Sequence, residues 1–66
     1  MNISLQNLSK QVETAKTKQA LKGIIVYAEE YQRSALAKHD YQGSYDAAFV
    51  IEKAEEKIRS MTISFF

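Results

Sequence analysis

Apolar residues recur with a helical period in the last third of the chain. From about residue 44 to 61 they follow the i, i+3, i+4, i+7 spacing of one helix face, and the charged residues take the other face. The apolar positions are Ala47, Val50, Ile51, Ala54, Ile58 and Met61. The pattern predicts an amphipathic helix over residues 44–61, followed by an apolar tail at 62–66.

The first half of the chain has two apolar stripes that disagree in direction. On a wheel of about 100° per residue, one set clusters on one side and a later set on the opposite side. The first set is Leu5, Leu8, Val12 and Ala15, and the second is Leu21, Ile24, Ile25, Ala28, Tyr31 and Ala35. A single straight helix over residues 4–38 cannot bury both stripes in one compact core. Either the chain breaks between Thr14 and Lys18, where Thr14 and Thr17 are suitable N-caps, or a long helix bridges two partners.

We therefore predict helices over residues 4–15, 17–38 and 44–61, separated by a break and a turn. The turn is predicted at residues 39–43, with Gly43 supplying a positive φ and Ser44 acting as the N-cap of the last helix. Proline is absent and only two glycines occur, while strand patterns lack matching partners. The predicted fold is one all-α domain: a short N-terminal helix and an antiparallel helical hairpin.

Chain length makes a dimer the expected state. A chain of 66 residues without cysteine gains little net stability from its own core and has no disulfides to supplement it. We also predict that six apolar residues contact a partner, and all of them except Tyr31 fall outside the main stripes. These residues are Val26, Tyr27, Tyr31, Ile63, Phe65 and Phe66. Alternatively, Phe65 and Phe66 fold back onto the hairpin as a cap.

Tyrosine is frequent in this chain, at positions 27, 31, 41 and 45. Its apolar ring and polar tip suit both interfaces and core edges. Tyr27 lies off the main stripe and is the better candidate for outside contact. For Tyr45, and to a lesser degree Tyr31, packing at the core edge near the turn is the favoured interpretation. The tyrosines at 41 and 45 are also placed to meet those at 27 and 31 across the mouth of the hairpin.

Enzymatic chemistry has little support in this sequence. The one histidine, His39, falls in the predicted turn, where it and Asp40 are too few for a zinc site and have no evident nucleophile relay. No glycine-rich phosphate loop is present, and the longest apolar runs are far shorter than a membrane span. We expect no catalytic residues, metal, cofactor, small-molecule substrate or membrane contact. Without a recognisable secretory signal, the expected location is the cytoplasm.

Charge is unevenly distributed, although the net charge is only +1. Residues 1–38 carry six basic against three acidic side chains, and residues 39–66 carry three against five. Lys10, Lys16, Lys18 and Lys22 are candidate phosphate contacts if two copies bring their basic halves together on DNA. Those lysines spread around the helix rather than forming one stripe. The first hypothesis is therefore a helical module that binds a larger protein, such as a bacterial or phage regulator, inhibitor or accessory factor, and the alternative is a dimeric DNA-binding regulator.

Overall fold

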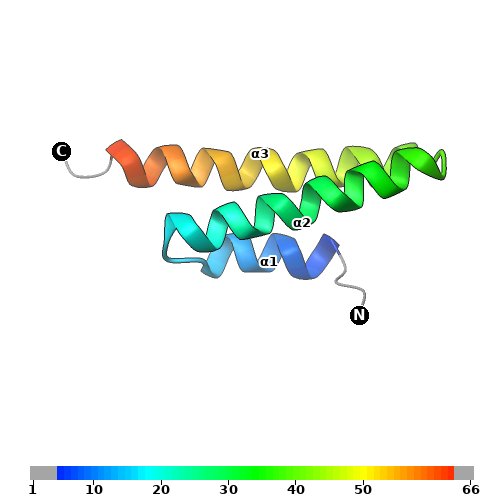
Figure 1. The fold of residues 1–66 in the computed structure, drawn as a ribbon. Coiled ribbons are helices and arrows are strands. Elements are labelled where there is room, and N and C mark those ends of the chain that lie inside the picture. The colour runs from blue at the N-terminus through cyan, green and yellow to red at the C-terminus, as the bar shows by residue number, and fades with distance from the viewer. Residues whose placement is uncertain (1–4, 64–66) are drawn as a thin grey trace.

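The computed structural model describes residues 5–63, which form three helices and contain no strand (Figure 1). The helices are α1 (Leu5–Thr14), α2 (Lys18–Ala37) and α3 (Tyr41–Ile63). The predicted all-α, three-helix class is confirmed. The main difference from the sequence-based boundaries is the start of α3, which comes three residues earlier than expected. The predicted tail residues 64–66 lie outside the described part of the chain.

The chain breaks between Thr14 and Lys18, which is the first of the two arrangements that the opposed stripes allow. Thr17 has extended backbone angles (φ −131°, ψ 152°), and its hydroxyl accepts a hydrogen bond of 3.1 Å from the backbone N–H of Ala20. This is the N-cap geometry expected of threonine. The change of direction turns Leu8 and Val12 of α1 toward the same interior as Leu21 of α2, and all three are buried.

The turn between α2 and α3 corrects two sequence-based expectations. The residue with positive φ is His39 (φ 61°), and neither glycine has one. His39 N–H donates to Leu36 O at 3.1 Å and Asp40 N–H to Ala35 O at 2.8 Å, which is the Schellman pattern of helix termination. Because this motif reverses the chain within three residues, α3 starts before Gly43 is reached.

The N-cap of α3 is Asp40 rather than Ser44. Its Oδ1 accepts a hydrogen bond of 3.0 Å from Gly43 N–H, and Ser44 is buried inside the helix. Gly43 matters for another reason than its φ. A Cβ at this position would lie 2.6 Å from Oδ2 of Asp40, so the capping carboxylate occupies the space that a larger residue needs.

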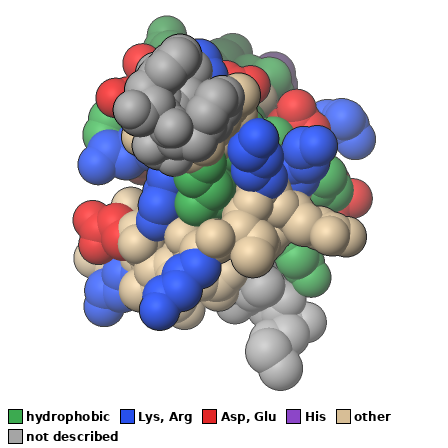
Figure 2. Space-filling view, turned by 90° about the vertical axis from the view of Figure 1, so that its left-hand side faces the viewer, with side chains coloured by type: hydrophobic (Ala, Val, Ile, Leu, Met, Phe, Trp, Pro, Cys, Tyr) green, Lys and Arg blue, Asp and Glu red, His purple; other side chains and the backbone are tan. Residues whose placement is uncertain are grey.

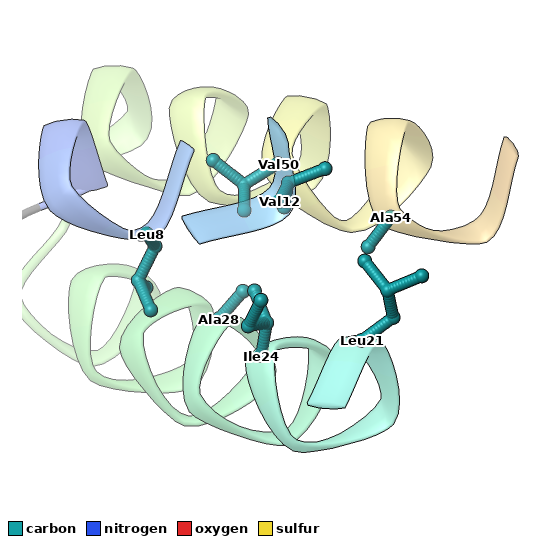
Figure 3. Close-up of a cluster of buried hydrophobic side chains, with 7 residues drawn as sticks. All are labelled: Leu8, Val12, Leu21, Ile24, Ala28, Val50 and Ala54. Carbon is teal, nitrogen blue, oxygen red and sulfur yellow. The ribbon is translucent and has the colours of Figure 1, made fainter. Parts of the chain in front are cut away.

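The core lies where α1 rests against the α2 and α3 pair. Figure 1 shows α2 and α3 side by side along most of their length, with α1 beside the first half of α2. Side chains from all three helices meet in one cluster (Figure 3). Its members are Leu8, Val12, Leu21, Ile24, Ala28, Val50 and Ala54. Ala28 and Ala54 have no exposed surface, so small side chains fill the space between α2 and α3.

A lysine on α3 holds the end of α1. The Nζ of Lys57 donates hydrogen bonds of 2.7 Å to the backbone carbonyls of both Val12 and Glu13. These are among the last carbonyls of α1, which lack helical partners and carry the negative end of the helix dipole. Lys57 is only partly exposed, and its bond to Val12 O is part-buried while its bond to Glu13 O is exposed. We call this contact the Lys57 latch.

Replacing Lys57 with methionine tests the latch, because methionine keeps most of the aliphatic stem and removes the ammonium group. Hydrogen bonds that involve a charged group contribute about 1.5–3 kcal/mol each to stability. We expect Lys57→Met to lower the free energy of unfolding, measured by urea titration, by about 2 kcal/mol. Arg59→Gln is the matched control, since Arg59 is an exposed cation on the same helix. Equal urea midpoints for the two variants would show that the latch contributes nothing.

Replacing His39 with glycine tests the turn. A residue other than glycine pays roughly 1–2 kcal/mol for the left-handed conformation, and glycine recovers part of this after its greater entropy loss on folding. We expect His39→Gly to raise the free energy of unfolding by about 0.5–1 kcal/mol and His39→Val to lower it. A His39→Gly protein less stable than the parent would contradict the Schellman assignment.

Candidate protein-docking surface

On α3 the large aromatic side chains face solvent and the small side chains are buried, which is the reverse of the usual arrangement. Tyr41, Tyr45 and Phe49 are 58%, 73% and 57% exposed. The buried positions of the same part of the helix carry small residues: Gly43, Ser44, Ala47, Val50 and Ala54. Large aromatic side chains normally provide much of the buried area of a small domain. We call Tyr41, Tyr45 and Phe49 the aromatic strip.

The aromatic strip is continuous along the helix. Its members are spaced by four residues, which places them on one face over a rise of about 12 Å. At the turn end, the ring of His39 lies 6.3 Å from that of Tyr41, and its Nδ1 is 3.4 Å from the tyrosine hydroxyl. At the other end, the Lys53 ammonium lies 5.2 Å from the centre of the Phe49 ring. The three solvent-facing rings therefore have a polar residue at each end of their row.

Acidic side chains predominate beside the aromatic strip. Glu52 and Glu56 follow Phe49 at i+3 and i+7, so they continue the same face, and both are exposed. Asp46 is also exposed, and its Oδ1 accepts a hydrogen bond of 3.0 Å from Nε2 of Gln42. Two exposed basic residues accompany these three carboxylates: Lys53 lies among them, and Arg59 follows Glu56 at i+3 on the same face. The outer face of α3 thus combines three rings with a net negative border.

Of the residues predicted to contact a partner, those on α2 are exposed. Val26 and Tyr27 are each 55% exposed and Tyr31 is 37% exposed. A role for them in binding stays a prediction. Ile63 is the last residue of α3, and its side chain, like Phe65 and Phe66, lies outside what the structure describes.

The expectation that Tyr45 packs at the core edge is wrong, since it is the most exposed of the large hydrophobic residues described. The suggested meeting of tyrosines across the hairpin mouth is not found either. Within residues 5–63, the ring contact of Tyr41 is with His39 rather than with the tyrosines of α2. The aromatic strip therefore stands apart from the tyrosines of α2.

The sequence shows the spacing of the aromatic strip, although not its exposure. Positions 41, 45 and 49 have the four-residue spacing of one helix face. A helix that starts at Ser44, as predicted from the sequence, does not include Tyr41 and so does not show this repeat. Asp40, three residues before Gly43, was the signal for the earlier start.

The four lysines proposed for DNA contact are all exposed, but they are divided between two helices and the connection. Lys10 belongs to α1, Lys16 to the connection, and Lys18 and Lys22 to α2. Figure 2 views the molecule from the end where α1 meets α2, and the basic side chains visible there are spread around that end, with acidic and uncharged side chains among them. A DNA-binding role for these lysines stays a prediction.

The structure brings no cluster of potential metal ligands together among residues 5–63. Groups of three or more potential metal ligands are absent from this range, and His39 lies exposed in the turn. A depression of about 300 Å³ lies between α1 and α3 and has mixed charge. It is lined by Val12, Glu13, Lys53, Glu56, Lys57 and Ser60.

Comparisons with known proteins find no match for this chain among family models, curated proteins or solved structures. None of the helices within residues 5–63 has the length and apolar character needed to cross a membrane.

Unfolding measurements on two residues of α3 test whether the aromatic strip supports the fold. Tyrosine and serine have similar helix propensities, and Tyr45 loses little area on folding. We expect Tyr45→Ser to change the free energy of unfolding by less than about 0.5 kcal/mol. Val50→Ala, one turn away in the core, should lower it by about 2 kcal/mol. A Tyr45→Ser protein as unstable as Val50→Ala would assign the ring a structural role.

Proposed function

We propose that this chain is a cytoplasmic, non-enzymatic interaction module in which an antiparallel hairpin, braced by a short N-terminal helix, presents the aromatic strip to a larger protein. By occupying that partner's surface it acts as a regulator, inhibitor or accessory factor. The observation that carries the proposal is the inverted side-chain size on α3, with rings outside and alanines inside.

The energetic argument starts from the small core. Fully burying one large apolar side chain contributes about 1.5–3 kcal/mol, which matters greatly in a chain of 66 residues. Three aromatic rings on one helix face could supply much of that stability but are left in water. Contiguous exposed apolar surface of this kind is characteristic of binding sites.

Helix geometry indicates how the aromatic strip would be recognised. Anchors at i, i+4 and i+8 suit a helix that lies in an apolar groove of its partner. Tyrosine is among the residues most often found at the energetic centre of interfaces. The carboxylates of Asp46, Glu52 and Glu56 call for a groove with basic residues on its rim.

The same charges argue against other occupants of this face. If two copies paired through their aromatic strips, the acidic border of one copy would face the acidic border of the other, and the like charges would repel. Nucleic acid and anionic lipid would be repelled for the same reason. We therefore propose a protein partner whose apolar groove has basic residues on its rim. Val26, Tyr27 and Tyr31 form a separate, secondary surface in this proposal.

Site-specific photocrosslinking in the cells that produce the protein tests this proposal. A photoreactive phenylalanine analogue replaces Tyr45, and in a matched chain it replaces Arg59, which is exposed on α3 beyond the aromatic strip. We expect one discrete adduct, heavier than two copies of the chain, from position 45 and not from position 59. Adding Tyr41→Ser and Phe49→Ser should reduce its yield at least tenfold, since each lost anchor removes 1 kcal/mol or more, roughly a factor of five.

Three outcomes would contradict the proposal. An adduct of twice the chain mass would show that a second copy binds the aromatic strip. Equal yields of the heavier adduct from positions 45 and 59 would show that contact with the partner is not specific to the aromatic strip. Crosslinking to DNA would favour the alternative function. In that case binding should weaken steeply with salt, and replacing Lys16, Lys18 and Lys22 with alanine should flatten that dependence.

A further inference from the structure

We propose that α1 exchanges between two copies of the chain: residues 5–37 straighten into one helix, and the α1 segment of each copy packs on the α2 and α3 pair of the other. This dimer does not involve the aromatic strip and goes beyond the proposed function. Its basis is the connection between α1 and α2, together with the opposed apolar stripes on either side of it.

The connection has three residues, since α1 ends at Thr14 and α2 begins at Lys18, and helical hydrogen bonds reach into it from both sides. Ala15 N–H still donates to Gln11 O at 2.8 Å, and the helical pattern resumes when Leu21 N–H donates to Thr17 O at 3.2 Å. Neither glycine nor proline occurs between these points. Straightening Lys16 and Thr17 would let the backbone N–H groups of residues 16–20 bond to the carbonyls of residues 12–16, so one continuous helix would gain hydrogen bonds that the bend leaves unmade.

The Lys57 latch competes with that straightening. The carbonyls of Val12 and Glu13, which accept from Lys57 Nζ at 2.7 Å in the bent chain, are the acceptors that Lys16 and Thr17 N–H would need. The Thr17 hydroxyl favours the bend as well, by capping α2 through Ala20 N–H. Two side-chain contacts thus hold the bent form against a helix with continuous backbone bonding.

The opposed stripes determine where α1 would go. In a straight helix Leu8 and Val12 face away from the side that carries Leu21 and Ile24, so they cannot reach their own α3. The surface that α1 leaves, which includes Val50 and Ala54, fits an apolar i, i+4 pair on a helix. The α1 segment of a second copy fits this surface, because it is identical to the segment that has left. When each copy donates its α1 to the other, a twofold axis relates the two copies and both surfaces are covered by the contacts already present in the bent chain.

Proline at position 18 separates the two forms. Lys18 is the first residue of α2, where proline is well tolerated, and Thr17 already has the extended conformation that a following proline requires. A continuous helix would have proline in its interior, which removes a hydrogen bond and clashes with the preceding turn. Lys18→Pro therefore permits the bent chain and blocks the straight one, and Lys18→Ala is its control for the lost charge.

Light scattering after size exclusion, over a dilution series up to about 1 mM protein, measures the dimer fraction of the parent and each variant, with circular dichroism to verify folding. We expect the parent to dimerise and Lys18→Pro to raise the dimer dissociation constant at least 100-fold, because each dimer would contain two interior prolines. Lys18→Ala should retain dimerisation. Thr17→Ala, which removes the cap, and Lys57→Met, which removes the latch, should each lower the constant at least tenfold.

Two results would overturn the exchange. A Lys18→Pro protein that is folded and dimerises as the parent does would place the dimer interface elsewhere. Parent, Thr17→Ala and Lys57→Met proteins that all remain monomeric over the whole series would show that the bent form is the only one. Because Tyr41, Tyr45 and Phe49 are unchanged in these variants, failure here is distinct from failure of the proposed docking role.

Discussion

The bend between α1 and α2 is the constraint on which the rest of this fold depends. Two apolar stripes on opposite sides of one stretch of chain cannot share an interior unless the chain changes direction between them. The change takes three residues, and it brings Leu8 and Val12 onto the cluster formed by α2 and α3 (Figure 3). Without the bend, a chain could not contribute the Leu8 and Val12 side chains to its own core.

Polar contacts stabilise the bend and the turn at their helix ends. Thr17 caps the start of α2, Asp40 caps the start of α3, and the ammonium of Lys57 satisfies two carbonyls at the end of α1. Each of these side chains bonds to a backbone N–H or C=O group that has no partner within its own helix. A ten-residue helix such as α1 is too short to be stable alone, so its order depends on this latch and on the apolar contacts beneath it.

Sequence periodicity was sufficient for the class of fold and for most of the core. The break near Thr17 followed from the stripe directions, and the buried residues of α1 and α2 lie on the predicted stripes. The turn was harder, because glycine is the usual residue at positive φ and here a histidine occupies that position. A glycine turn at residues 39–43 predicts a helix that starts at Ser44, and such a helix does not include Tyr41, which is in register with Tyr45 and Phe49 in α3. Exposure of the aromatic strip followed from alanines filling the core, a packing result that no local pattern specifies.

Methyl nuclear Overhauser effects in a dilute, monomeric sample test the bend most directly. The structure brings the methyl groups of Val12 on α1 into one cluster with those of Val50 and Ala54 on α3. The account predicts cross-peaks between these groups, which persist on dilution. Absence of those cross-peaks, together with sequential contacts of an unbroken helix through residues 15–17, would contradict it.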